Sequence, residues 1–374
     1  MTSAWTEGTR AVRAGSPGHG TGDPFLAGPV FAGTYNLPGE IAEQPYQYGR
    51  FANPTWTALE HAIGDLEGAA DTVGFASGMA AISAVLHGLT APGDTVVLPA
   101  DGYPATRTAG AHIAERGVTV RHAPTAGPEI EHALAGAGLV FLETPSNPGL
   151  DVCDIERIAA LAHEQGALVV VDNTLATPLG QRPLDLGADI SLASGTKGLT
   201  GHSDILLGYV ACANTELGTR VRSWRTLTGA VPGPMEAWIA HRSLSTLHLR
   251  VDRQADNALA VAHALLGRPD VTGVRHPGLP DDPSHATAHR TMRRYGCVVA
   301  FTLADAATAT RFLSALELVA EATSFGGTHS MAERRARWAG NDVAPGFIRF
   351  SAGCEDTADL VADITHALDV ATRG

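Results

Sequence analysis

The sequence predicts an α/β protein with a mainly parallel sheet and a smaller C-terminal α+β domain. Its 374 residues exceed the usual size of a single hydrophobic core, so two domains are expected. Between residues 95 and 195, short apolar runs alternate with helical segments, which is typical of parallel strands joined by crossover helices. Near residue 245 the pattern changes to a long helix followed by the Pro-rich segment HPGLPDDP, where we place the domain boundary.

The N-terminal residues 1–55 are rich in Gly, Pro and aromatic residues and show little periodicity. We therefore predict an extended arm rather than a core element. Arms of this kind often reach a neighbouring subunit.

The large domain is predicted to span residues 56–245. Its first helix is indicated by Leu59, Ile63 and Leu66 at helical spacing, with Gly68 as a stop signal. The predicted strands are TVVLPA, VTVRHA, LVFLETP, ALVVVDN and DISLASG, and the clearest helices between them are AISAVLHGL and DIERIAALAHEQG.

The C-terminal domain is predicted to span residues 246–374. The long helical pattern LRVDRQADNALAVAHALLG opens it. A strand (CVVAFTL), a helix (AATATRFLSALEL), a second strand (GFIRFSAG) and a final helix follow, which is an α+β pattern.

The composition excludes several classes of protein. With 44% hydrophobic and 17% charged residues, the chain resembles ordinary globular proteins. It has no apolar run near the ~18 residues of a membrane span and no signal-peptide core, so we expect a cytoplasmic protein. A net charge of -13 argues against nucleic acid or an anionic membrane as a partner. An anionic ligand must therefore be held by local donors.

Metal binding is not predicted either. The 16 histidines form no HExxH or comparable ligand spacing. The four cysteines, Cys153, Cys212, Cys297 and Cys354, are isolated in the sequence, and we interpret them as small buried hydrophobic residues.

Lys197 is the strongest candidate for a catalytic residue. It follows an apolar run and the segment Ser194, Gly195, Thr196, in which the two hydroxyl groups can donate hydrogen bonds to a phosphate. Most lysines are solvated surface charges, but a sheltered lysine with a lowered pKa is what Schiff-base chemistry requires.

Asp172 ends ALVVVDN, the most continuously apolar run of the chain and therefore a predicted buried central strand. A carboxylate at the carboxyl end of such a strand lies where open α/β sheets bind ligands. The alternative is a helix cap for the next segment.

A third candidate is the segment FASGMAAISAVL, in which Ser77, Gly78 and Met79 open a predicted helix. Backbone amides at a helix N-terminus bind anions, and glycine permits close approach. An ordinary helix cap explains this pattern equally well.

Together, six motifs resemble the Cys/Met-metabolism family of pyridoxal phosphate (PLP) enzymes, which includes cystathionine γ-lyase, methionine γ-lyase and cystathionine γ-synthase. In order, they are YGRFANPTWTALE, FASGMAA, ETPSNP, VVVDNT, SGTKGLTGHSD and FIRFSAG. The resemblance extends from about residue 45 to the C-terminus. It implies the aminotransferase-like fold (fold type I), with PLP held as a Schiff base on Lys197.

The resemblance also implies roles at matching positions around PLP. Asp172 pairs with the pyridine nitrogen, Tyr103 stacks on the ring and assists proton transfers, and Thr174 lies beneath the ring. Phosphate donors are Gly78, Met79, Ser194 and Thr196, and the substrate carboxylate site contains Asn147, Ser324 and Arg349. Tyr48 and Arg50 are sent to the phosphate of a neighbouring subunit, which implies a tetramer built from dimers that share active sites.

The reaction implied is γ-elimination of a sulfur amino acid, cystathionine or methionine. The products are 2-oxobutyrate, ammonia and a thiol (cysteine or methanethiol). Alternatives are γ-replacement of the cystathionine γ-synthase type, β-elimination, or a catalytically silent PLP-binding protein.

Two departures from the family pattern affect these expectations. Tyr103 is followed by Pro104 rather than glycine, which predicts a stiffer loop. Thr323 precedes Ser324, where many cystathionine-cleaving members carry glutamate for the distal ammonium of the substrate. This change favours a compact thioether such as methionine. The alternative is that another residue supplies the missing charge, and the candidates are His329, Glu333, Arg334 and Arg335.

Overall fold

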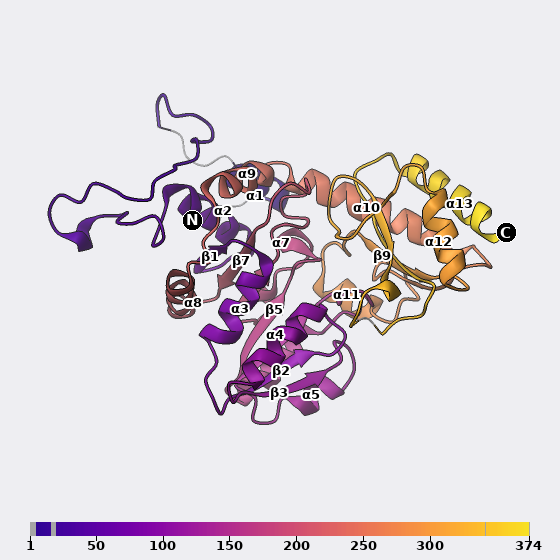
Figure 1. Ribbon diagram of the computed structural model, residues 1–374, viewed down its shortest axis with the longest axis horizontal. Helices are drawn as coiled ribbons and strands as arrows, with labels where there is room; N and C mark the ends of the chain where they lie inside the picture. The colour runs from indigo at the N-terminus through magenta and orange to yellow at the C-terminus, as the bar shows by residue number, and fades with distance from the viewer. Residues whose placement is uncertain (1–4, 16–19, 341, 374) are drawn as a thin grey trace.

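The computed structural model describes residues 5–15, 20–340 and 342–373. The large domain contains a seven-stranded sheet with the order β1-β7-β6-β5-β4-β2-β3 (Figure 1). The strands are β1 (Asp71–Phe75), β2 (Thr95–Pro99), β3 (Thr119–Ala123), β4 (Leu139–Glu143), β5 (Leu168–Asp172), β6 (Ile190–Ala193) and β7 (Gly208–Cys212). Only β7 runs antiparallel to its neighbours β1 and β6. The predicted mainly parallel sheet is confirmed.

Both faces of this sheet are covered by helices. They are α2 (Pro54–Glu67), α3 (Gly78–Gly88), α4 (Pro104–Ala114), α5 (Glu129–Ala133), α6 (Ile155–Glu164), α7 (Thr177–Gly180), α8 (Thr215–Thr228) and α9 (Pro234–Leu244), with the short 3-10 helix η2 (Pro183–Leu186). In β5, Val170 packs in the core under α3, whereas Val169 and Val171 pack in the core under α6. Burial on both faces explains why this strand is apolar at every position before Asp172.

The C-terminal domain is built around a second sheet. Its five-stranded sheet has the order β10-β11-β12-β9-β8, in which all pairs except β10–β11 are antiparallel. The strands are β8 (Thr272–Arg275), β9 (Val298–Thr302), β10 (Ala320–Glu321), β11 (Met331–Arg334) and β12 (Phe347–Ser351). The helices are α10 (Leu247–Leu266), α11 (His285–Thr291), α12 (Ala306–Ala315) and α13 (Thr357–Thr372), with the 3-10 helix η3 (Arg335–Arg337). Phe301 and Phe312 pack edge to face in its core. The predicted α+β character is thus present.

Part of the predicted arm is not extended. Residues Glu7–Ala14 form helix α1, and Ala11 and Ala14 are buried against the large domain. The prediction missed this helix because two small alanines give a weak periodic signal. Of the predicted arm, residues 1–4 and 16–19 lie outside the described residues.

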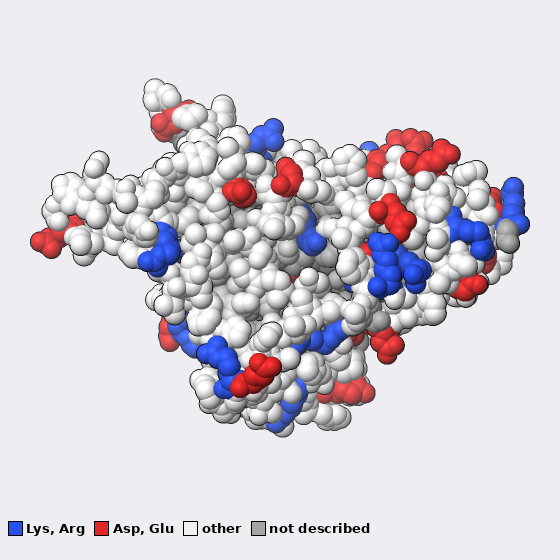
Figure 2. Space-filling view, in the orientation of Figure 1, with Lys and Arg blue, Asp and Glu red and all other residues white. Residues whose placement is uncertain are grey.

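The following segment, residues 20–52, projects from the large domain (Figure 1) and contains the short 3-10 helix η1 (Ile41–Glu43). Its apolar side chains are unusually exposed: Phe31 is 70% exposed and Ile41 is 58% exposed. Figure 2 shows few charged side chains on this projection. On the same face of the molecule, positive and negative residues are interspersed rather than gathered in one basic patch. Among the described helices, none has the length and apolar character that crossing a bilayer requires.

Candidate active site

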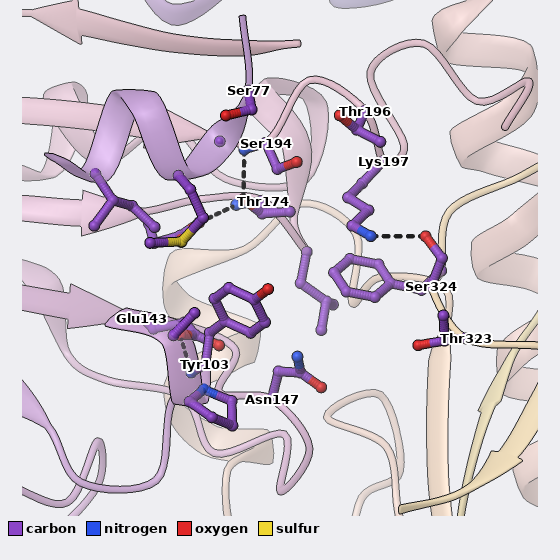
Figure 3. A pocket seen from close by; sticks show the side chains of 18 of the residues that line it. Ser77, Tyr103, Glu143, Asn147, Thr174, Ser194, Thr196, Lys197, Thr323 and Ser324 are labelled. Atoms are coloured by element: carbon purple, nitrogen blue, oxygen red, sulfur yellow. Dashed lines mark hydrogen bonds between the residues drawn. The ribbon is translucent and has the colours of Figure 1, made fainter. Parts of the chain in front are cut away.

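A cavity of about 540 Å³ lies where the carboxyl ends of the parallel strands meet the C-terminal domain (Figure 3). Strand β4 ends in Glu143 and β5 ends in Asp172, and both residues line the cavity. Lys197 lies in the turn after β6. Ser324 and Arg349 reach the same cavity from the C-terminal domain. The position agrees with the rule that open α/β sheets bind ligands at the carboxyl ends of their strands.

The Lys197 amine lies inside this cavity. Its Nζ donates a hydrogen bond to Ser324 Oγ at 2.7 Å and lies 5.3 Å from the centre of the Phe325 ring. Burial, assisted by the nearby Arg349 charge, lowers the pKa of Lys197 from 10.5 to about 8. Lys197 is also the only lysine in the sequence. This count is a sequence signal beyond the motifs, because it leaves one side-chain amine in the whole chain for Schiff-base chemistry.

Asp172 lies buried at the end of β5, and its Oδ1 accepts a hydrogen bond from the Thr174 amide at 3.0 Å. Burial raises its pKa. Glu143 is its partner in the β4–β5 register and is also buried. The pKa of Glu143 is raised well above its usual value, mainly by burial and secondly by the Asp172 charge. Two buried carboxyl groups without a cation are costly. The protonated pyridine nitrogen of PLP, placed beside Asp172, would offset this cost.

Glu143 was not predicted, and it supports Tyr103. Its Oε2 accepts a hydrogen bond from the Tyr103 backbone amide at 2.6 Å, at the point where Pro104 begins helix α4. The phenol ring extends into the cavity, and Tyr103 is 40% exposed (Figure 3). In the sequence, Glu143 ends a buried strand and opens the motif ETPSNP, but no role was assigned to it.

The end of the cavity that is lined by Ser77, Gly78 and Ser194 suits a phosphate group. Ser77 caps α3, its Oγ accepting from the Ala80 amide at 3.1 Å. A Cβ at Gly78 would lie 2.7 Å from the Ser194 Cβ, so glycine alone permits this close approach. Thr174 Oγ1 in turn accepts from the Ser194 amide at 2.8 Å. A helix N-terminus beside hydroxyl groups forms an anion-binding site.

The C-terminal domain contributes a buried arginine on β12. Arg349 donates to Asn147 Oδ1 at 2.8 Å, to the Ser324 carbonyl at 3.0 Å and to Glu333 Oε1 at 2.5 Å. Burial lowers the pKa of Arg349 to about 10, which leaves it charged at neutral pH. Ser324 has φ of 95°, a left-handed backbone that non-glycine residues rarely adopt and that clusters at functional sites.

The cavity brings together most of the predicted site residues. They are Gly78, Met79, Tyr103, Asn147, Asp172, Thr174, Ser194, Thr196, Lys197, Thr323, Ser324 and Arg349. Tyr48 and Arg50 do not line it. They lie on the projecting segment, where Tyr48 is 43% exposed and Arg50 donates to the Thr226 carbonyl at 2.6 Å. Ser77, which opens the predicted phosphate-binding helix, also lines the cavity, whereas Trp338 is a lining residue that the sequence did not single out.

The lowered pKa of Lys197 gives a testable expectation for the cofactor-free protein. An amine-acylating reagent should label Lys197 with a midpoint near pH 8 rather than 10.5, because the neutral amine is the nucleophile. Peptide mass spectrometry separates this label from the α-amino group, and Lys197→Ala has no side-chain amine to label. The same shift makes folding stability rise between pH 8 and 10.5, where the unfolded chain still binds the proton. A labelling midpoint of 10.5 would show that the amine is not desolvated.

Comparison with known proteins identifies the family. The model of the Cys/Met metabolism PLP-dependent enzymes matches residues 9–369. A putative cystathionine gamma-lyase from Streptomyces coelicolor is 59% identical, over 99% of this chain and 95% of that protein. The L-methionine gamma-lyase of Pseudomonas deceptionensis is 39% identical, over 87% of this chain and 86% of that protein.

The fold comparison agrees. The crystal structure of cystathionine gamma synthase from Xanthomonas oryzae pv. oryzae, in complex with aminoacrylate and cysteine, matches with a TM-score of 0.95 and 34% identity, over 99% of this chain and all of that chain. The chain therefore belongs to the Cys/Met metabolism family of PLP-dependent enzymes.

Proposed function

We propose that this protein catalyses the PLP-dependent γ-elimination of a sulfur amino acid, cystathionine or methionine. One water and one cystathionine would give 2-oxobutyrate, ammonia and cysteine; methionine would give methanethiol instead of cysteine. The observation that carries the proposal is the position of the only lysine, whose buried amine shares one cavity with Asp172, Tyr103 and Arg349.

The cavity residues fit PLP at three points. When bound, PLP supplies a conjugated ring that accepts electrons from the substrate carbon skeleton. The Asp172 carboxylate would hold the proton on the ring nitrogen, and Tyr103 would lie against the ring. The N-terminus of α3, with Ser194 and Thr196, would bind the phosphate.

The substrate would be oriented by residues of both domains. Arg349 and Asn147 are 2.8 Å apart and would bind the α-carboxylate, since a planar guanidinium can engage both oxygens. The Lys197 amine would remove the α-proton and then a β-proton. A pKa of about 8 leaves part of this amine neutral near pH 7, which suits a general base. Tyr103 would donate a proton to the departing sulfur.

The second candidate is γ-replacement, in which a thiol adds at the γ-carbon. A specific comparison favours it: a crystal structure of a cystathionine gamma synthase matches with a TM-score of 0.95. Incubating the PLP-loaded protein with L-cystathionine, L-methionine or L-homocysteine tests the elimination. We expect 2-oxobutyrate from at least one of them without any added thiol. No keto acid from all three would refute the proposal.

We further propose that the active sites are shared between subunits of a homo-oligomer, with the tetramer as the expected state. In the part of the chain that the structure describes, the cationic residues lining the cavity are Lys197, Arg335 and Arg349. The phosphate end, around Gly78 and Ser194, is thus without a guanidinium from its own chain. Arg50 lies on the projecting segment, whose exposed apolar side chains fit burial against a second copy.

Mixed oligomers test this arrangement. Arg50→Ala and Lys197→Ala subunits should each be inactive alone, but a hybrid dimer places an intact Lys197 opposite an intact Arg50. Random exchange makes half of the dimers hybrid with one intact site each, so about a quarter of the wild-type activity should return. The matched control mixes Lys197→Ala with a chain carrying both substitutions, which has no intact combination. If exchange is demonstrated and no activity returns, Arg50 does not act across the subunit boundary.

A further inference from the structure

Helix α10 crosses the boundary between the two domains. It packs against α1, α7 and α9 of the large domain and against α13, β8 and β9 of the C-terminal domain (Figure 1). Its buried polar side chains are Arg250, Gln254 and Asn257. Their spacing of i, i+4 and i+7 places them on one face of the helix. Because buried polar groups are hydrogen-bonded, the partners of this face show what the helix holds.

Arg250 binds the segment that carries Lys197. Its Nη1 donates to the Gly198 carbonyl at 2.8 Å, and its Nη2 donates to the Leu199 carbonyl at 3.0 Å. A Cβ at Gly201 would collide with the guanidinium, so this segment is folded around Arg250. Burial lowers the pKa of Arg250 to about 10, which leaves it charged at neutral pH. Hydrogen bonds from a charged donor are the stronger kind.

Gln254, one turn further along α10, binds the segment that carries Ser324. Its Nε2 donates to the Gly326 carbonyl at 3.2 Å and to the Gly327 carbonyl at 2.7 Å. The left-handed backbone of Ser324 persists only where the surrounding structure holds it. Gln254 supplies two of the hydrogen bonds that hold the residues directly after it.

The two segments meet in front of α10. A Cβ at Gly326 would lie 2.6 Å from the Gly198 amide nitrogen, so glycine permits their close approach. Lys197 Nζ donates to Ser324 Oγ at 2.7 Å across this contact (Figure 3). Lys197 and Ser324 are 127 residues apart in the sequence and belong to different domains. Their distance therefore depends on the element that binds both segments.

We propose that Arg250 and Gln254 are positioning residues, which hold Lys197 and Ser324 together so that the Ser324 hydroxyl orients the free amine. The inference rests on the proposed function, in which Lys197 is the base. Neither positioning residue lines the cavity that contains the amine, and both act through backbone carbonyl groups. A displacement of about 1 Å in a reacting group can lower the rate about a hundredfold.

Asn257 provides a matched control on the same face of α10. Its Nδ2 donates to the Gly353 carbonyl at 3.0 Å and to the Glu355 carbonyl at 2.9 Å. Like Gln254, it is a buried amide that pairs with two carbonyl groups. Residues 353–355, however, include none of the residues that line the cavity. Gln254→Met and Asn257→Leu should lower the melting temperature by similar amounts, because each leaves two buried carbonyl oxygens without their donor.

Labelling of the cofactor-free protein separates the two variants without any catalysis. An acylating reagent should react with Lys197 in the wild type with a midpoint near pH 8. In Gln254→Met the Ser324 segment is held less firmly against the amine, so water reaches it and the midpoint should rise by about one pH unit. Gln254 is neutral, and the charges that act on the amine, those of Arg349, Glu333 and Arg335, are unchanged. Asn257→Leu should keep the wild-type midpoint.

Turnover of the PLP-loaded protein gives a second readout. Gln254→Met should lower kcat for 2-oxobutyrate release about tenfold to a hundredfold, with a smaller change in KM, because it displaces the base rather than the α-carboxylate site. Asn257→Leu should retain the wild-type kcat. At the other positioning residue, Arg250→Lys keeps the charge and one donor, so its kcat should lie between those of Arg250→Met and the wild type.

The outcomes separate this inference from the proposed function. If Gln254→Met and Asn257→Leu are equally destabilised and neither moves the Lys197 midpoint, α10 serves folding alone and the positioning role is overturned. Should Gln254→Met fail to fold, Gln254→Asn, which draws the amide back by one methylene, is compared with Asn257→Leu in the same way. If the wild type releases no 2-oxobutyrate, the elimination fails, and the labelling midpoints still decide on the positioning role.

Discussion

Lys197→Ala is expected to lower kcat for 2-oxobutyrate release by at least about a thousandfold, because the substitution removes both the general base and the covalent anchor of the cofactor. No second lysine exists in the chain to replace it. The wild-type protein loaded with PLP should yield a borohydride-reducible adduct that peptide mapping places on Lys197. The variant should yield no side-chain adduct.

The folding stability of the variant is the control for this loss of activity. Lys197 makes one side-chain hydrogen bond, to Ser324, and its ammonium is disfavoured by burial, so its removal should leave thermal unfolding of the cofactor-free protein nearly unchanged. Lys197→Arg provides a second comparison, since it keeps a positive charge but forms no linkage with an aldehyde. A reducible side-chain adduct in Lys197→Ala would contradict the assignment.

Asp172→Asn is expected to lower kcat by about a hundredfold to a thousandfold, the usual effect of removing one preorganised electrostatic partner from an active site. The amide keeps an oxygen that can accept from the Thr174 amide, as Oδ1 does at 3.0 Å. The neutral amide cannot form an ion pair with the protonated pyridine nitrogen of PLP. PLP should therefore bind more weakly, and activity should not return at saturating PLP.

The folding stability of cofactor-free Asp172→Asn should be maintained or rise, although its activity falls. Burial raises the pKa of Asp172, so the folded cofactor-free protein carries a penalty for the ionised form that is present above the folded pKa. Asparagine removes this penalty, and we expect the melting temperature of the cofactor-free variant at pH 8 to equal or exceed that of the wild type. Asp185→Asn, at a carboxylate with 47% of its side chain exposed, is the matched control for activity. A melting temperature well below wild type would mean that Asp172 serves folding rather than the cofactor.

The sequence predicted the parallel strands because their signal is strong. The runs of β4 and β5 are apolar at every position before the last, since both faces of the sheet are buried there, and they end at Glu143 and Asp172 on the ligand-binding edge. The antiparallel strand β7 and its edge partner β1 were not predicted. Gly208–Cys212 is a short run without a turn signal that distinguishes it from the loop after Lys197.

The sequence indicated cavity residues where they lie in motifs and missed contacts that depend on tertiary structure. Asp172 ends β5 and Lys197 lies in the turn directly after β6, so their approach to the ligand-binding edge follows from local structure. Glu333 was considered only as a source of the missing charge, and its ion pair with Arg349 forms only when β11 and β12 pair. Contacts of this kind depend on strand register, which one sequence does not specify.

The choice between elimination and replacement is the central claim, and one partition experiment tests it most directly. An O-acyl-L-homoserine can lose its γ-substituent in either reaction, so the PLP-loaded protein is given this compound together with saturating L-cysteine. Both 2-oxobutyrate and cystathionine are then measured over the same interval. The proposal predicts 2-oxobutyrate as the main product even at saturating thiol. Formation of cystathionine with almost no keto acid would show that the enzyme is a γ-synthase.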